Sequence, residues 1–198
     1  MLNIQSIALC LLLSLLVPWL SWAGSLTEAQ YQIYNNDVLV VHQAEFATPV
    51  ANKDWQAITD AYNSLQAPTY WVWKTSLSEK SVYEDTSPDG SVWNWTTYIG
   101  QSVQERDGWA RMYNPGPLNP SLPQVRDAYT KIFGGTGASA TQRAHLLSLS
   151  RRPARRIEVL FIQTGSGDGS AATPAVMVFE GQITYTDTAH AIGGVPLP

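Results

Sequence analysis

The sequence predicts a mainly α-helical fold: a single helical domain with a short C-terminal β-hairpin or β element. Apolar side chains recur at helical spacing in several segments, and residues that start or stop helices flank those segments. Only a few short runs are rich enough in aromatic and β-branched residues to favour strands. The chain has 198 residues, of which 44% are apolar and 14% charged. These values are typical of one folded domain and exclude a disordered chain.

Charge and cysteine content exclude several classes of protein. The formal net charge is −4, so bulk charge would not hold this chain to nucleic acid, and we expect no nucleic-acid partner. Cys10 is the only cysteine, whereas a disulfide framework or a cysteine-based metal site needs at least two thiols. We therefore expect neither a metal ion nor another cofactor.

Residues 1–24 form a hydrophobic leader. The run Ile7–Leu20 is apolar apart from one serine and is short for a membrane span. Ser21 and Ala23 place small residues before a possible cleavage site, but the first basic side chain is Lys53, so the positive start of a signal peptide is missing. The leader is interpreted as a signal peptide, an uncleaved membrane anchor or the product of a start codon assigned too far upstream. We favour the last.

The expected globular domain spans residues 25–190, and residues 191–198 are expected to form a flexible tail. Its first element is a helix, because Ser25 and Glu28 fit the S-x-x-E capping box. This helix is expected to end near Tyr34, before a turn rich in asparagine.

The next elements are expected from apolar spacing and composition. The short apolar run at 38–41 fits either a strand or a buried helical turn. Over 54–63, apolar residues at positions i, i+3 and i+7 predict an amphipathic helix. The aromatic and β-branched run at 70–73 follows a proline and predicts a strand.

A single long helix is predicted over 93–113. Its apolar positions recur at three-, four- and six-residue steps with charged residues between them, which is typical of a helix with one buried face. These positions are Trp95, Ile99, Val103, Trp109 and Met112. Three prolines between residues 114 and 120 end this helix.

Three further helices and a hairpin complete the prediction. Helices are expected at 122–133, 138–149 and 155–162, with the first closed by two glycines. Apolar and polar residues alternate at 176–179 and again at 182–186, which predicts a short hairpin near the C-terminus.

A cluster of arginines is the strongest local charge signal. Arg151, Arg152, Arg155 and Arg156 place four guanidinium groups within six positions. Such groups bind phosphate and carboxylate equally well, and Glu158 offers an internal partner. We expect these arginines to serve structure or contact with a partner protein rather than contact with nucleic acid.

Two tryptophan pairs are the second candidate contact site. Trp71 and Trp73, and likewise Trp93 and Trp95, are two positions apart. Both rings of a pair share one face of a strand, whereas they diverge on a helix. Because tryptophan and arginine dominate interface energetics, whichever of these rings are exposed are expected to bind a partner. We expect the tryptophan rings that are not exposed to pack in the core rather than to stack on sugars.

No pattern in the sequence marks a catalytic centre. The glycine-rich segment 164–170 lacks the lysine and the following helix of a phosphate-binding loop. A hydrolase using Glu105 or Asp127 is an alternative, but nothing local brings two carboxylates together. We expect a protein without enzymatic activity.

Several stretches together resemble a family of small, mostly uncharacterised proteins encoded by tailed bacteriophages and prophages. The resemblance covers about residues 26 to 188. The matching stretches are Trp73–Thr75, Trp95–Ser102, Glu105–Trp109, Val125–Arg126, Ile132–Gly134, Arg151–Phe161 (RRPARRIEVLF), Thr173–Gly181 (TPAVMVFEG) and Ile183–Tyr185.

The resemblance implies a non-enzymatic structural or morphogenesis protein of the virion, such as a head, connector or tail component. It implies other virion proteins as partners, oligomerisation in the particle and assembly in the host cytoplasm, and it carries over no catalytic residue. The hydrophobic leader departs from that family, whose members begin near the capping box. The alternative is an exported periplasmic or cell-surface binding protein, with membrane contact only through the leader.

Overall fold

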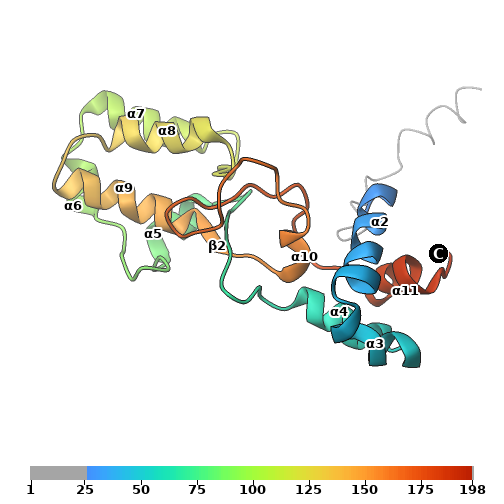
Figure 1. Cartoon of the computed structure of the whole chain (residues 1–198). Coiled ribbons are helices and arrows are strands. Elements are labelled where there is room, and N and C mark those ends of the chain that lie inside the picture. Colours follow the sequence, from blue (N-terminus) through green and yellow to red (C-terminus); the bar gives the residue numbers. More distant parts are fainter. Residues whose placement is uncertain (1–25, 198) are drawn as a thin grey trace, which may run out of the picture.

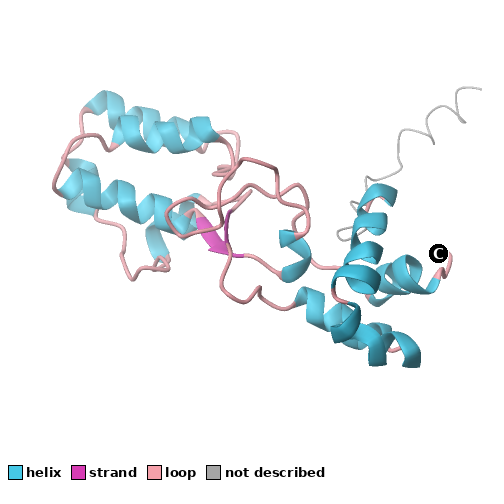
Figure 2. Cartoon of the chain, viewed as in Figure 1, coloured by secondary structure: helices cyan, strands magenta, loops and turns pink. Residues whose placement is uncertain are grey.

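The computed structural model describes residues 26–197, and its fold is mainly α-helical, as predicted (Figures 1 and 2). The molecule is elongated: α2, α3, α4 and α11 gather at one end, α6 to α9 lie at the other, and a small sheet lies between them. The helices are α2 (Glu28–Asn36), the π-helical turn η1 (Asp37–Val41), α3 (Gln43–Asn52), α4 (Trp55–Asn63), α5 (Glu79–Glu84), α6 (Trp95–Ile99), α7 (Val103–Met112), α8 (Pro123–Ile132), α9 (Ala138–Leu149), α10 (Arg156–Val159) and α11 (Tyr185–Gly193). The strands are β1 (Trp71–Trp73) and β2 (Arg151–Pro153).

The first helix begins close to the predicted position but with a different cap. Thr27 is the N-cap residue of α2 and forms a reciprocal capping box with Gln30. Ser25 and the predicted leader lie outside the described residues. The turn predicted after Tyr34 is wrong, because the chain continues through α2 into η1. The wider π turn directs Asp37 and Val38 into the core, where both are buried.

The helix predicted over 54–63 is confirmed as α4. Asp54 caps it by accepting a hydrogen bond from the backbone N–H of Ala57 at 3.1 Å. Its apolar face, formed by Trp55, Ile58 and Tyr62, is buried. Helix α3 was not predicted from the sequence. It ends where Lys53 adopts a left-handed conformation.

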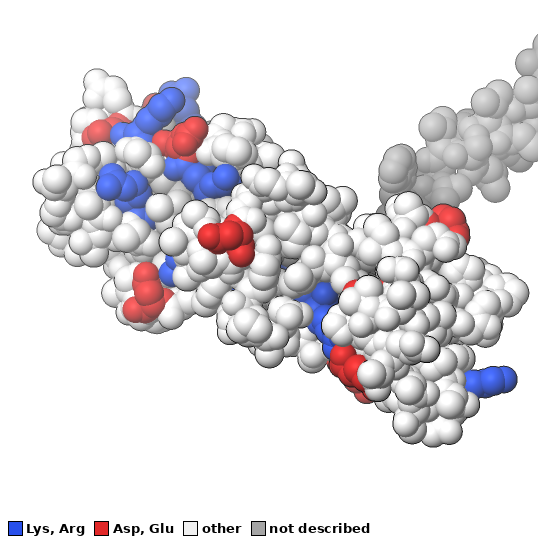
Figure 3. Space-filling view, in the orientation of Figure 1, with Lys and Arg blue, Asp and Glu red and all other residues white. Residues whose placement is uncertain are grey.

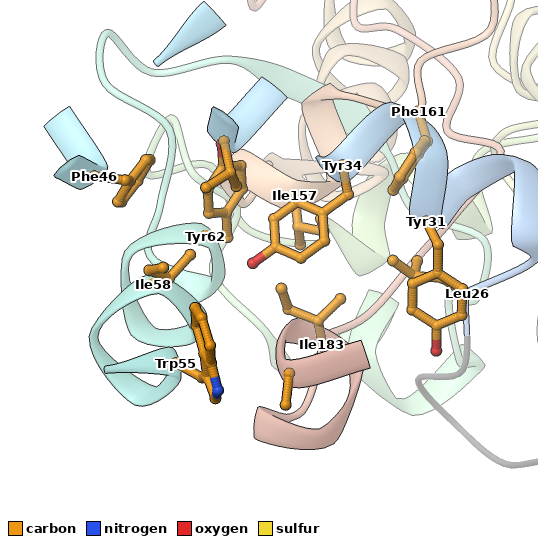
Figure 4. Packing of buried hydrophobic residues seen from close by; sticks show 12 residues of the cluster. Leu26, Tyr31, Tyr34, Phe46, Trp55, Ile58, Tyr62, Ile157, Phe161 and Ile183 are labelled. Carbon is orange, nitrogen blue, oxygen red and sulfur yellow. The ribbon is translucent and has the colours of Figure 1, made fainter. Parts of the chain in front are cut away.

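The first hydrophobic cluster lies among α2, η1, α3, α4, α10 and α11 (Figure 4). Helix α11 packs against both α4 and α2, so the two ends of the described chain meet in this cluster. Its buried members are Leu26, Tyr31, Tyr34, Val38, Phe46, Trp55, Ile58, Tyr62, Ile157, Phe161, Ile183 and Ala189.

The single helix predicted over 93–113 is wrong. The chain forms two helices, α6 and α7, separated by the segment 100–102. Ser102 starts the second helix: its hydroxyl accepts from the backbone of Glu105 at 3.2 Å, and the Glu105 carboxylate accepts from the backbone of Ser102 at 2.8 Å. This capping box begins a helix where periodicity alone predicted a helix interior.

The second hydrophobic cluster lies among α5, α7, α8 and α9 and is rich in aromatic rings. Trp109 is fully buried at its centre, and its ring stacks on that of Trp93 with centroids 5.4 Å apart. Helices α8 and α9 confirm the predictions over 122–133 and 138–149. The buried members are Leu77, Val82, Trp93, Trp109, Leu118, Tyr129, Ile132, Phe133 and Leu146.

The β element of this fold is a two-stranded antiparallel sheet in the middle of the molecule. The strand predicted over 70–73 is confirmed as β1, and its partner is β2, which the sequence did not predict. In the register, Trp71 lies opposite Pro153, Val72 opposite Arg152 and Trp73 opposite Arg151. The helix predicted over 155–162 is correspondingly shorter, because only α10 is helical.

The predicted hairpin at 176–186 is wrong. Met177 forms only an isolated bridge with Ile162, and α11 starts at Tyr185 after a capping box between Thr184 and Asp187. The alternating pattern arises because Ile183 packs into the first cluster immediately before the helix begins. The tail predicted from residue 191 is also corrected in part, since α11 runs to Gly193 and the next two backbone N–H groups bond back to it.

Candidate functional site

Arg152 is one of the four predicted contact residues. Its guanidinium is bonded to other residues of the same chain. Its guanidinium forms two hydrogen bonds with the Glu158 carboxylate, at 2.8 and 2.7 Å, and a third with Glu180 at 3.0 Å. The Glu158 side chain has no exposed surface. Burial opposes its ionisation, but hydrogen bonds from Arg152 and from two backbone N–H groups outweigh burial and lower the pKa of Glu158.

Arg156 is also paired internally. Its guanidinium bonds both oxygens of the Glu45 carboxylate, at 2.5 and 2.8 Å. It lies 4.6 Å from the ring centroid of Tyr62 and 5.1 Å from that of Phe46, within cation–π range. A cavity of about 430 Å³ opens beside this pair. His42 lines the same cavity, with its Nδ1 3.4 Å from Glu45. The charges of Arg156 and Glu45 therefore pair with each other at the edge of this cavity.

Arg151 and Arg155 complete the cluster. The Arg151 guanidinium lies 5.3 Å from the ring centroid of Trp71 and donates to the backbone carbonyl of Ala171. Arg155 is the N-cap residue of α10, and its backbone N–H donates to Glu158 at 2.8 Å. All four arginine side chains are half-buried. On the face shown in Figure 3, basic and acidic side chains lie beside one another without a continuous basic patch.

The four predicted tryptophans fall into two different environments. Trp71 and Trp73 lie on β1, and each ring has an arginine over it: Arg151 over Trp71, and Arg126 over Trp73 at 4.5 Å. Trp73 and Trp93 are buried. Trp95, at the start of α6, is 50% exposed and is therefore the tryptophan of the four that is available to a partner.

Exposed apolar side chains continue from Trp95 along α6 and into α7. Ile99 is 63% exposed and Val103 is 68% exposed. These three residues follow one another at four-residue intervals, and we call them the α6–α7 surface. The Trp95 ring is held in place by Tyr83 and Tyr98, at centroid distances of 4.7 and 5.9 Å. Trp95 is one of the residues that the sequence predicted as a contact if exposed. Ile99 and Val103 were missed, because the sequence analysis placed them on the buried face of one long helix.

A polar network lies near this surface, between α9 and the loop that precedes α6. The hydroxyl of Ser91 lies 3.1 Å from Nδ1 of His145 and 2.7 Å from the Asp89 carboxylate, which also accepts from Ser87 at 2.5 Å. Desolvation lowers the pKa of the buried His145 imidazole, which therefore stays neutral near pH 7. Burial opposes ionisation of Asp89, but bonds from Ser87 and Ser91 outweigh it and lower its pKa. The sequence offered no spacing that connects these residues.

The carboxylates considered for catalysis have structural partners or lie on the surface. Glu105 caps α7. The neighbouring acidic residue Asp107 pairs with Arg111 one helical turn away at 2.9 Å. Asp127 is exposed on α8. Within residues 26–197, no group of three or more histidine, cysteine or acidic side chains is arranged to hold a metal ion. None of the helices in that range has the length and apolar content needed to cross a bilayer.

The candidate site therefore consists of the α6–α7 surface and the polar segment beside it, rather than the arginine cluster. No protein-family model, curated protein or solved structure matches this chain. The resemblance to tailed-bacteriophage proteins stays a prediction based on its sequence motifs. What this site can do follows from its own chemistry: it offers apolar contact area and hydrogen-bond donors, and its charged groups are paired within the chain.

Proposed function

We propose that this chain is a non-enzymatic structural or morphogenesis protein of a bacteriophage virion, and that it acts by binding other proteins through the α6–α7 surface. The observation that carries the proposal is the exposure of Trp95, Ile99 and Val103, which are 50%, 63% and 68% accessible. Single exposed apolar residues are normal on protein surfaces, whereas groups of them mark interaction sites. These three lie within nine consecutive residues of the chain.

The chemistry of the surface suits a protein partner. Tryptophan is enriched among residues that dominate binding energy. The Trp95 ring already packs against Tyr83 and Tyr98, so little side-chain freedom is lost when a partner covers its other side. The partners proposed are other virion proteins, including further copies of this chain in the particle, assembled in the host cytoplasm.

A matched pair of substitutions tests the proposal. Val103 and Val178 are almost equally exposed, at 68% and 69%. The backbone of Val178 bonds to that of Phe161, a member of the first hydrophobic cluster, whereas α6 and α7 lie at the other end of the molecule (Figure 1). Val103→Asp places a charge on the surface without disturbing α7, because an acidic residue is favourable in the first turn of a helix. Val178→Asp is the control.

The measurement is incorporation of each full-length variant into particles produced by a lysogenic host, together with the mass of the purified chain by light scattering. We expect wild type and Val178→Asp to pellet with particles and Val103→Asp to be reduced about tenfold or more. Equal incorporation of both variants, or recovery of the wild type in the periplasm rather than in particles, would overturn the proposal. The periplasmic result would instead favour an exported binding protein.

A further inference from the structure

A cavity of about 530 Å³ lies between the C-terminal end of α5 and strand β2. Glu84 and Asp85 line it at the end of α5, and Arg151 and Arg152 line it from β2. Lys74, which directly follows β1, completes the charged part of the lining. None of the three residues of the α6–α7 surface lines this cavity, so the cavity is a separate feature of the molecule.

The backbone of Lys74 is fixed, whereas its side chain has no partner. Its backbone N–H donates to the carbonyl of Ser150 at 2.8 Å, and its carbonyl accepts from the backbone of Ser121 at 3.1 Å. Its ammonium forms no hydrogen bond or ion pair with residues 26–197. Lys74 Nζ is also not among the buried atoms that lack a partner in this range, so the nitrogen remains reachable from solvent.

The ammonium lies close to the other charges of the cavity. Burial lowers the pKa of Lys74, while the nearby Asp85 raises it and Arg152 lowers it. Both of these neighbours line the cavity. The half-buried cation has thus lost part of its hydration without gaining a partner. An anion in the cavity would supply that partner.

Two of the charged lining residues are already neutralised within the chain. Arg152 is bonded to the buried Glu158 carboxylate. Glu84 lies 3.7 Å from the ammonium of Lys80, one turn earlier in α5. These two residues therefore add little net charge to the cavity.

The remaining charges of the lining are those of Lys74, Arg151 and Asp85, none of which forms an ion pair with residues 26–197. Arg151 donates only to uncharged acceptors, the carbonyl of Ala171 and the hydroxyl of Ser148. Two cations and one anion leave a single positive charge, which one carboxylate balances. A phosphate dianion would exceed that charge, and Asp85 would repel it more strongly.

The apolar part of the lining indicates what carries the carboxylate. Pro88, Leu149 and Pro153 line the same cavity. A carboxylate on an aliphatic stem can contact these side chains and the Lys74 ammonium together. The side chain of glutamate has this form.

We propose that this cavity binds a glutamate side chain of a partner protein, with the carboxylate paired to the Lys74 ammonium. The inference rests on the proposed function only in taking the ligand to be a protein. It adds a charged contact to the apolar contact at the α6–α7 surface. Asp85 competes for the same ammonium and therefore weakens binding of the ligand.

The test uses the blocked peptide N-acetyl-Ala-Glu-Ala-N-methylamide, titrated to millimolar concentration into the full-length protein labelled with ¹³C-lysine. The chain has four lysines, and Lys53, Lys80 and Lys131 are exposed, so these three serve as internal controls. We expect a saturable shift of the Lys74 ε-methylene resonance alone. The pKa of Lys74 should rise in the bound state, because a paired carboxylate favours the ammonium. The matched peptide with glutamine in place of glutamate should produce neither change.

Two substitutions should change the affinity in opposite directions. Lys74→Gln keeps most of the stem but removes the charge, and should weaken peptide binding about tenfold. Lys131→Gln, on the exposed face of α8, is the matched control and should bind as the wild type does. Asp85→Asn changes an exposed side chain and should tighten binding about threefold, because it removes the competing carboxylate.

The inference is wrong if the Lys74 resonance does not move, if the glutamine peptide moves it equally, or if Asp85→Asn does not tighten binding. Tighter binding of inorganic phosphate or butyrate than of the glutamate peptide would assign the cavity to a small anion and overturn the protein ligand.

The two proposals can fail separately, because Val103 does not line the cavity. Loss of particle incorporation in Val103→Asp without peptide binding to the wild type would refute the carboxylate site alone. Peptide binding with normal incorporation of Val103→Asp would refute the proposed function alone.

Discussion

Arg152 and Glu158 form a two-pronged ion pair, with Nη1 2.8 Å from Oε2 and Nη2 2.7 Å from Oε1. The carboxylate also accepts the backbone N–H groups of Arg155 at 2.8 Å and Gly181 at 3.0 Å. One buried side chain thus joins β2, the start of α10 and the segment that leads to α11. The Arg152–Glu158 pair therefore stabilises the contacts among these three segments in the middle of the molecule.

Removing the cation of this pair should destabilise the protein strongly. Arg152→Ala leaves the Glu158 carboxylate buried without its principal partner, and we expect the free energy of unfolding to fall by about 3 kcal/mol. Urea denaturation followed by tryptophan fluorescence measures the change. The control is Arg111→Ala, which breaks the exposed pair with Asp107 and should cost less than about 1 kcal/mol. Equal losses for the two variants would contradict a structural role for Arg152.

The contribution of Glu158 should depend on pH. Its pKa in the folded protein is lowered from the usual 4.5, so its stabilising effect is fully present above that value and is lost as the pH falls through the lower, folded-state pKa. The stability difference between wild type and Glu158→Gln should therefore be largest near pH 7 and shrink below pH 4.5. Urea unfolding at a series of pH values tests this, and a constant difference would show that the carboxylate charge is not involved.

His145 should add a second, separate pH dependence. Desolvation lowers its pKa from 6.5, so the unfolded chain takes up a proton first as the pH falls. Stability is thus fully present above pH 6.5 and declines as the pH drops towards the folded-state pKa. Wild type should lose more stability over this interval than His145→Gln. NMR titration of the wild-type imidazole provides a second test, which fails if the ring titrates at or above 6.5.

The Tyr62 hydroxyl donates to the carboxylate of Asp37, the first residue of η1. Burial, followed by this hydrogen bond, raises the pKa of Tyr62, so the phenol remains a donor. Tyr62→Phe keeps the ring under Arg156 but removes the donor, and should lower the free energy of unfolding by about 1–2 kcal/mol. Tyr98→Phe is the control, because the Tyr98 hydroxyl has no hydrogen bond within residues 26–197. A similar effect of both changes would argue against an important Tyr62–Asp37 bond.

The sequence correctly predicted those helices and strands whose formation depends on residues close together in the chain. Helix α4 follows from the spacing of Trp55, Ile58 and Tyr62, and α9 was predicted with the bounds observed. Strand β1 follows from its aromatic and β-branched composition. In each of these segments, the residues that determine the structure lie within a few positions of one another.

The elements that were missed depend on distant partners or on competition between local signals. Strand β2 exists because Arg151–Pro153 pairs with β1, which is far away in the sequence. Apolar and polar residues alternate before α11, as they do in a strand. The capping box at Thr184 and the burial of Ile183 favour a helix there instead. Likewise, the capping box at Ser102 interrupts a helical period that continues in the sequence.

The sequence by itself determined the helical character of this protein and the residue types from which its contacts are built. Only the tertiary structure decided which of those residues face a partner. It placed Glu45 against Arg156, 111 positions apart in the chain. The charge of this arginine is therefore paired within the chain. It also left Trp95 exposed while burying Trp93, two positions away. The physical reason is that burial and charge pairing are set by contacts between distant segments, which local periodicity does not encode.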